Sequence, residues 1–414
     1  MVNYFYDCYV ILNKVYSDKT YLKQAINGTF IEESNRSLTI KTVYGVLDKD
    51  IELSYYISKL CDKSPKLVIR TIVKIAMYAI KYLGKKEYAV TKSAVELTKK
   101  LGKKGVSGFV NAILRKFISA DIRLPKDDIK ALSIKYSYPE FAISSLIKEY
   151  GRQKTESILS YHSTKGTLVF YDMDGEKYLS DMGVNYEKTP FHNVFMVENF
   201  VRNSDYDLGK YTFQSIGSVS ICDLVEPCEL LLDCCAAPGG KSIRLSYKCK
   251  NVLSFDIHEH RVGLINDYKA RMRRDNVTAL VQDSKVFNKE LECSFDAVLC
   301  DAPCSGLGVV NDNPDIKLNR TYKDVECLKN EQTSILNNVS KYVKVGGHLY
   351  YSTCSILPEE NIGTIDNFIA VNDNYKIVEI DSVLPHLNIK GANQFLPDIS
   401  SGAGFFIAKL QRLK

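Results

Sequence analysis

The sequence lacks an uninterrupted apolar run of about 18 residues, the length that a membrane-spanning helix requires. It also lacks the features of a secretory signal. No basic segment leads the chain, Asp7 and Lys14 interrupt the apolar start, and no small-residue cleavage site follows. We therefore expect neither a membrane protein nor a secreted one, but a cytoplasmic chain. The 414 residues, 45% hydrophobic and 25% charged, are typical of a globular protein with two or three domains.

Spacing suited to a metal site is missing as well. The 12 cysteines are scattered, and Cys300 with Cys304 has no second pair that would complete a tetrahedral set. His258 and His260 flank a glutamate, but no third or fourth ligand accompanies them. We expect no metal and, in a reducing compartment, free thiols. A cysteine with a chemical role here should be a nucleophile or a base.

Positive charge is concentrated in one region. The net charge is +6, but residues 61–120 hold 14 Lys and Arg against three acids, a local +11 that leaves −5 for the remainder. A second basic run contains Arg271, Arg273 and Arg274. Such clusters attract polyanions, although a solvated helical face is the alternative. Neither segment has the long apolar face of a membrane-surface helix, so nucleic acid is the better candidate.

The hydrophobic periodicity changes along the chain. Apolar residues repeat every three or four positions within residues 5–16, 68–79, 94–101 and 109–117, which predicts an all-α domain over residues 1–120. Residues 121–205 mix a helix after Pro139 with short strand-like runs, which indicates a small α+β subdomain. From residue 206, short apolar runs alternate with helical stretches, the pattern of a Rossmann-like α/β domain over residues 206–414 with parallel strands and helices on both faces.

Aspartates recur where these strands end. Four of the runs end in or pass through one, namely Asp233, Asp256, Asp283 and Asp301. In such sheets the ligand lies beyond the carboxyl ends of the strands. A single aspartate there is more often a cap or a turn residue, but four in register argue for a binding site.

The ligand should be a nucleoside without phosphates. The small residues after Asp233, in CCAAPGGKS, let a ligand approach the backbone, yet form neither GxGxxG nor a P-loop. Asp256, 23 residues further on, could accept hydrogen bonds from both ribose hydroxyls, and Asp283 could accept from an adenine amino group. S-adenosylmethionine fits this description best.

Two cysteines follow neighbouring strands. Cys304 lies in DAPCSG and Cys354 in STCS, so both thiols should reach the cofactor crevice. A lone buried cysteine is usually inert, but a thiolate that adds to C6 of a pyrimidine activates C5 for methylation, and a second thiol can assist removal of the C5 proton. Asp301 would hold N3 of the ring and offset the developing charge.

At these residues the sequence resembles a known family. The segments DCCAAPGGK, DAPCSG, NPDIK and YSTCSILPEEN are similar to the signature segments of the NOL1/NOP2/Sun RNA 5-methylcytosine methyltransferases. The helical segment AVELTKKLGKKGVSGFVNAILRKF and the ending LPDISSGAGFFIAKL resemble the bacterial Sun/RsmB branch, with its NusB-like RNA-binding domain. The likeness covers nearly the whole chain, and the usual substrate of that branch is 16S ribosomal RNA.

The resemblance implies roles position by position. Cys354 matches the nucleophile and Cys304 the cysteine needed for product release, with Asp301 beside them. The implied cofactor-binding residues are Cys235, Ala236, Ala237, Pro238, Gly239, Gly240, Lys241, Asp256, Asp283 and Asp301. Two departures bear on RNA affinity: Phe213-Gln214-Ser215 stands where Gln-Asp is common, and Asn311-Asp312-Asn313 where a basic pair is common.

The sequence thus predicts a monomeric, metal-free, S-adenosylmethionine-dependent enzyme that forms 5-methylcytosine in RNA, expected to be 16S ribosomal RNA. Its parts would be a NusB-like domain (1–120), an α+β linker subdomain (121–205) and a Rossmann-like catalytic domain (206–414). Alternatives are a non-catalytic NusB-like RNA-binding or antitermination-type protein, and the same chemistry on another RNA such as tRNA. A dinucleotide-dependent oxidoreductase is opposed by the missing GxGxxG and by the thiol pair.

Overall fold

The computed structural model describes residues 2–198 and 200–414. Contacts within the chain divide it into two compact units, Met1–Ile147 with Val310–Thr321, and Lys148–Val309 with Tyr322–Lys414. This division does not follow the expected boundaries at 120 and 205, which remain predictions. Within the described residues, no helix is both long and apolar enough to span a bilayer.

The first unit is helical throughout. The four apolar stripes seen in the sequence lie on α1, α5, α6 and α7, and together form one core in which Ile72, Ile75 and Ala79 of α5 have no exposed surface. Its helices are α1 (Val2–Asp18), α2 (Leu22–Asn27), α3 (Glu33–Asp48), α4 (Asp50–Leu60), α5 (Leu67–Lys81), α6 (Glu87–Lys100), the short η1 (Lys104–Val106), α7 (Ser107–Ser119), α8 (Asp128–Tyr136) and α9 (Glu140–Tyr150), which crosses the boundary.

Part of the local positive charge in this unit is neutralised internally. Lys74 Nζ lies 2.5 Å from Asp50 Oδ1, and Lys81 Nζ lies 2.6 Å from Glu52 Oε1. Lys74 is almost fully buried. Two of the basic side chains of residues 61–120 are therefore structural, and the surface charge is smaller than the sequence count implies.

A segment distant in sequence completes the helical unit. Residues Val310–Thr321, with the short helix η3 (Pro314–Leu318), pack within it. Lys317 Nζ donates to the carbonyl and to Oδ1 of Asp48 at 2.8 and 2.6 Å, and Leu22 N donates to Asp315 Oδ2 at 3.2 Å. Burial raises the pKa of Asp48, but the ammonium groups of Lys317 and Lys49 outweigh it and lower that pKa to about 2. Burial in turn lowers the pKa of Lys317, although attraction and hydrogen bonding to Asp48 oppose that shift.

The second unit begins with a small antiparallel sheet of order β2-β3-β1-β4. Phe170, Phe195 and Tyr211 meet in its core. The elements are α10 (Arg152–Ser160), β1 (Lys165–Phe170), α11 (Gly175–Asp181), β2 (Tyr186–Lys188), β3 (Val194–Glu198), α12 (Ser204–Asp207) and β4 (Tyr211–Phe213). Together with α8 and α9, they give residues 121–205 the predicted α+β character.

The remainder of this unit is built on a nine-stranded mixed sheet of order β11-β12-β13-β9-β8-β5-β6-β7, with β10 paired to β13. The strands are β5 (Leu230–Asp233), β6 (Asn251–Asp256), β7 (Val277–Val281), β8 (Phe295–Asp301), β9 (Val343–Thr353), β10 (Tyr375–Val378), β11 (Leu387–Ile389), β12 (Ala392–Phe395) and β13 (Phe405–Arg412). The helices are α13 (Ile216–Leu224), α14 (Gly240–Leu245), α15 (Glu259–Arg271), α16 (Tyr322–Val339), α17 (Ile362–Val371) and the short η2 (Lys289–Leu291), η4 (Ser340–Tyr342) and η5 (Pro358–Glu360).

The predicted parallel pairing holds for five strands only. Strands β7, β6, β5, β8 and β9 are parallel, whereas β13 runs antiparallel to β9 and pairs with β10 and β12 in the same sense. The last four strands therefore correct the expectation of an all-parallel sheet. The physical reason is that β11 and β12 are joined by a tight turn, and antiparallel strands can be linked that way while parallel ones cannot.

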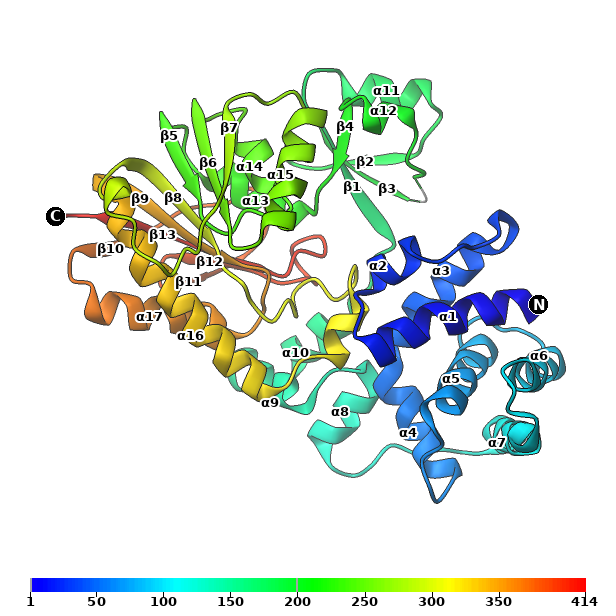
Figure 1. The fold of residues 1–414 in the computed structure, drawn as a ribbon. Coiled ribbons are helices and arrows are strands. Elements are labelled where there is room, and N and C mark those ends of the chain that lie inside the picture. The colour runs from blue at the N-terminus through cyan, green and yellow to red at the C-terminus, as the bar shows by residue number, and fades with distance from the viewer. Residues whose placement is uncertain (1, 199) are drawn as a thin grey trace. The chain divides into compact units, whose positions relative to one another are not determined.

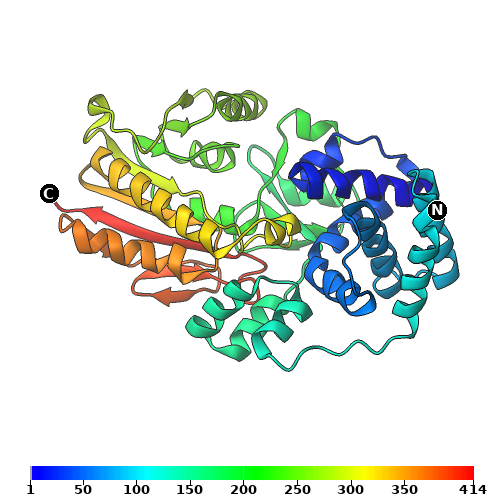
Figure 2. The same cartoon turned by 60° about the horizontal axis from the view of Figure 1, so that its bottom comes forward.

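Successive residues of the central strands enter different cores. Leu231, Leu299 and Tyr350 pack with residues of α13, α14 and α15, whereas their neighbours Leu232, Val298 and Tyr351 pack with α16 and α17. Figures 1 and 2 show these two groups of helices on opposite faces of the sheet. Both faces are therefore buried, which explains why these strands read as continuous apolar runs.

The strand order reverses beside β5. The chain runs from β5 to β6 and β7 on one side, then returns to β8 and β9 on the other. At such a point the loops after neighbouring strands part, which leaves room for a ligand at their carboxyl ends. The aspartates and cysteines singled out in the sequence follow these strands.

Candidate active site

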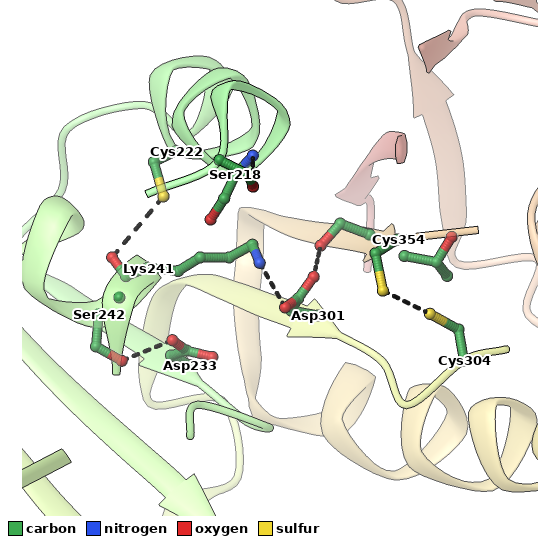
Figure 3. Close-up of polar contacts among 12 residues, drawn as sticks. Ser218, Cys222, Asp233, Lys241, Ser242, Asp301, Cys304 and Cys354 are labelled. Atoms are coloured by element: carbon green, nitrogen blue, oxygen red, sulfur yellow. Dashed lines mark hydrogen bonds and ion pairs between the residues drawn. The ribbon is translucent and has the colours of Figure 1, made fainter. Parts of the chain in front are cut away.

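The two predicted thiols meet. The Sγ atoms of Cys304 and Cys354 lie 3.2 Å apart, the first three residues after β8 and the second directly after β9 (Figure 3). Ala302 N donates to Ser352 O at 2.9 Å and so holds the two strand ends together. The predicted convergence of the thiols is confirmed as geometry.

The surroundings of Cys304 favour its protonated thiol. The pKa of Cys304 is raised well above its ordinary value, chiefly by its hydrogen bond with Cys354, and further by burial and by the negative charge of Cys354 and Glu360.

A buried ion pair lies beside the thiols. Lys241 Nζ is 2.7 Å from Asp301 Oδ2 (Figure 3). The hydroxyl of Ser352 donates to Asp301 Oδ1 at 2.7 Å. Burial alone would lower the pKa of Lys241, but attraction and hydrogen bonding to Asp301 outweigh it and raise that pKa, and negative charge on Cys354 adds to the effect. The ammonium group of Lys241 thus keeps its charge in the interior of the site, paired with Asp301.

The carboxyl group that ends β5, directly before the small-residue loop, has an unsatisfied acceptor. Asp233, fully buried, accepts from the Ser242 hydroxyl at 2.6 Å through Oδ2, while its Oδ1 has no partner among the described residues (Figure 3). Burial raises the pKa of Asp233 to about 7. Gly239 has φ +104°, and a Cβ there would lie 3.3 Å from the Ile265 backbone, so glycine is required for this close approach.

The other two predicted aspartates have local partners. Asp256, at the end of β6, accepts from His258 N at 3.3 Å and lies 3.4 Å from Arg261 Nη2. Asp283, two residues after β7, accepts from Lys285 N at 2.9 Å. Each carboxylate accepts from the backbone N–H two residues later, as in a turn. Both aspartates nevertheless lie at the carboxyl ends of the parallel strands, as the sequence predicted.

Sequence reasoning missed Gln214 as part of this site and noted it only within a departure. Its Nε2 donates to Gly240 O at 3.2 Å and to Ser218 Oγ at 3.1 Å, and its buried Oε1 has no partner among the described residues. Ser215, in the same departure, caps α13 by accepting from Ser218 N at 3.3 Å. A glutamine beside a short strand gives no sequence signal of this role, because its contact with residue 240 exists only in the fold.

A second missed feature is a backbone contact behind the cysteines. Gly308 N donates to Cys354 O at 3.0 Å, and a Cβ on Gly308 would lie 1.8 Å from Gly404 O. Only glycine fits there. The glycines of CSGLG and SGAG could have suggested this close approach.

Comparisons with known proteins agree with this architecture. Residues 223–411 match the family described as 16S rRNA methyltransferase RsmB/F, and residues 2–119 match the NusB family. The probable ribosomal RNA small subunit methyltransferase B of Bacillus subtilis (strain 168) is 30% identical over 427 residues, covering 97% of this chain and 95% of its own. The ribosomal RNA small subunit methyltransferase B of Proteus mirabilis (strain HI4320) is 30% identical over 412 residues, covering 92% of each chain.

The solved structure of PH0851 has the same fold. It superposes with a TM-score of 0.85 at 21% identity, covering 100% of this chain and 99% of its own. With the family matches, this confirms the predicted combination of a NusB-like helical part and a Rossmann-like methyltransferase part.

Proposed function

The chain belongs to the 16S rRNA methyltransferase RsmB/F family, and from that premise we propose that it forms 5-methylcytosine in RNA, with 16S ribosomal RNA as the substrate. The observation that carries the proposal is the pair of thiols 3.2 Å apart beside the Lys241–Asp301 ion pair. A nucleophile, a second thiol and a charged pair together are what pyrimidine C5 methylation requires.

The cofactor is S-adenosylmethionine, which when bound supplies a methyl group on a positively charged sulfur. The residues fit it: the buried Asp233 Oδ1 and Gln214 Oε1 need hydrogen-bond donors, and the amino acid and ribose parts of the cofactor carry such donors. The proposed binding residues are Cys235, Ala236, Ala237, Pro238, Gly239, Gly240, Lys241, Asp256, Asp283 and Asp301.

Cys354 is proposed as the nucleophile. Its thiolate adds to C6 of the cytosine, the S–C6 bond forms, and the ring electron pair becomes available at C5, which takes the methyl group. The Lys241–Asp301 pair would bind N3 and offset the charge that develops on the ring. The ammonium group of Lys241 also stabilises negative charge on the sulfur before attack.

Cys304 is proposed to act after methyl transfer. Removal of the C5 proton returns an electron pair to the ring, breaks the S–C6 bond and releases Cys354. Cys304 Sγ lies 3.2 Å from Cys354 Sγ, so it is close to the adduct from which this proton must leave.

The helical part is proposed to bind RNA by its phosphates. Helices α6 and α7 line a groove of about 720 Å³ that contains Lys92, Lys99, Arg115 and the exposed ring of Tyr88. Basic side chains neutralise phosphates, and an exposed ring can stack on a base. In this proposal residues 1–120 hold RNA, residues 121–205 link, and residues 206–414 carry out methyl transfer on a base turned out of the stack.

Bisulfite sequencing tests the substrate. Ribosomal RNA from cells that lack this protein should lose protection at one cytosine of 16S RNA, and the purified protein should restore it. If 16S RNA is unchanged but a protected cytosine is lost from tRNA, the substrate of the same reaction is tRNA. No lost site in either RNA would favour a non-catalytic RNA-binding protein.

A further inference from the structure

One buried carboxylate holds both cysteine loops. Glu360 ends the short helix η5 and has no exposed surface. Its Oε1 accepts from Ser305 N at 2.7 Å and from Gln332 Nε2 at 3.2 Å. Its Oε2 accepts from the hydroxyls of Ser305 and Ser355, both at 2.5 Å. Four donors from three separate parts of the chain therefore converge on a single side chain.

The two serines are the residues that directly follow the two thiols. Ser305 comes after Cys304 and Ser355 after Cys354, and the serine hydroxyls lie 3.2 Å from each other. Both serines are fully buried. Because one carboxylate binds both, any displacement of one cysteine loop against the other must break a bond to Glu360.

The side-chain amides of Gln332 and Asn361 make further hydrogen bonds next to the two cysteines. Gln332, on α16, also donates from Nε2 to Pro303 O at 2.9 Å, directly before Cys304. Asn361 donates to Ser355 O at 2.9 Å and accepts from the hydroxyl of Thr353 at 2.5 Å. The residues on both sides of each thiol are therefore hydrogen-bonded to Glu360, to Asn361 or to Gln332, which itself donates to Glu360.

A carboxylate is a costly choice for this position. All four donors are neutral groups, so no positive charge among them offsets the burial of a negative one. Burial accordingly raises the pKa of Glu360. An apolar side chain here would leave these four buried donors without an acceptor, so the carboxylate both satisfies them and fixes the positions of the two cysteine loops.

We propose that Glu360 is a positioning residue that sets the separation and orientation of the two active-site sulfurs through Ser305 and Ser355. The inference rests on the proposed function for its catalytic consequence, but the geometric part stands on the contacts alone. Displacement of a reacting group by about 1 Å can cost about 100-fold in rate, so this role is large enough to measure.

The variants differ in how many of the hydrogen bonds at position 360 they keep. Glu360→Ala removes every acceptor. Glu360→Gln keeps one carbonyl oxygen for Ser305 N and Gln332, while its NH₂ group can donate to the two hydroxyls, which are able to turn and accept. Glu331→Gln on α16 is the matched control: it removes one negative charge from an exposed side chain that pairs with Lys285.

The first measurement is methylation. Glu360→Ala should lower kcat about 100-fold, with KM for RNA and Kd for S-adenosylmethionine within about twofold of wild type. Glu360→Gln should recover most of this loss, and Glu331→Gln should equal wild type. A structural role alone would instead lower the fraction of active protein and leave kcat per folded molecule unchanged.

The second measurement needs neither RNA nor cofactor. Diamide takes two electrons and two protons from a thiol pair, so it converts neighbouring thiols to a disulfide. Mass spectrometry of the Cys304–Cys354 peptide should show this bond forming at least about tenfold more slowly in Glu360→Ala than in wild type. The oxidation rate tests the position of the two sulfurs even if the protein does not methylate RNA.

The outcomes separate cleanly. Wild-type oxidation and wild-type kcat in Glu360→Ala would overturn the proposal. Slow oxidation in a protein without RNA methyltransferase activity would support positioning and reject the proposed function. If Glu360→Ala does not fold, Ser305→Ala and Ser355→Ala carry the same test, since each removes one of the two hydroxyl contacts.

Discussion

Asp233 combines full burial with an ionisable group at the end of β5. Burial raises its pKa to about 7, the nearby charge of Asp301 adds to this, and the hydrogen bond from Ser242 opposes it. Between its ordinary value of 3.8 and about 7, the folded protein therefore holds a proton that the unfolded chain has released. Folding stability from this group is present at low pH and is lost as the pH rises through that window.

Asp233→Asn should remove this dependence. The measurement is urea unfolding without cofactor. From pH 5 to pH 8, the unfolding free energy of the variant should rise relative to that of wild type by on the order of 2–3 kcal/mol, since one pKa unit corresponds to about 1.4 kcal/mol. Other titrating groups are common to both proteins and cancel. An equal difference in unfolding free energy at both pH values would contradict the shifted pKa.

The two cysteines should fail in different ways. Cys354→Ala should reduce methyl transfer more than about 1,000-fold while S-adenosylmethionine still binds, because the nucleophile is gone. Cys304→Ala should leave a covalent protein–RNA adduct that migrates slowly on a denaturing gel. Cys327→Ala, an exposed thiol on α16, is the control and should behave as wild type. Absence of the adduct in Cys304→Ala would remove the release role.

At the scale of elements, the sequence predicted those parts whose signal is local. The apolar runs that became β5 to β9 and the residues directly after them were recognised, and so the thiol pair was anticipated. The strands β11 and β12 were missed because they are three and four residues long and β12 buries Asn393 and Gln394, which read as loop residues. Asn361 donates to Gln394 Oε1 at 2.7 Å, and no sequence pattern reveals this bond, whereas both polar side-chain atoms of Asn393 have no partner among the described residues.

The groove between α6 and α7 makes a prediction at this scale. Replacing Lys92, Lys99 and Arg115 by alanine should weaken RNA binding and lower the slope of log affinity against log salt by roughly 2–3, since each phosphate contact contributes about 0.7–0.9. Titrations at several salt concentrations measure this. Lys250→Ala is the control, because Lys250 is an exposed lysine directly before β6 and does not line the groove. An unchanged slope in the triple variant would show that RNA binds to a different surface of the protein.

For the molecule as a whole, composition and periodicity predicted a helical part and an α/β part, and both were found. They did not predict that Val310–Thr321 would pack with the helices. The reason is physical: the bonds that Lys317 makes to Asp48 join residues 269 positions apart, and neither partner differs locally from a surface residue. NPDIK, recognised as a methyltransferase signature, thus also packs within the helical unit, where Pro314, Asp315 and Lys317 are buried.

That excursion has a consequence for dissecting the protein. The chain passes from the loop of Cys304 into the helical unit at Val310 and comes back at Tyr322 to begin α16, so the two units are threaded through each other's sequence. No single cut of the polypeptide liberates either one intact. A fragment that starts after residue 147 would retain Lys317 and Leu318 without the residues that bury them. Its segment Val310–Thr321, which begins six residues after Cys304, would expose surface that the helical unit otherwise covers.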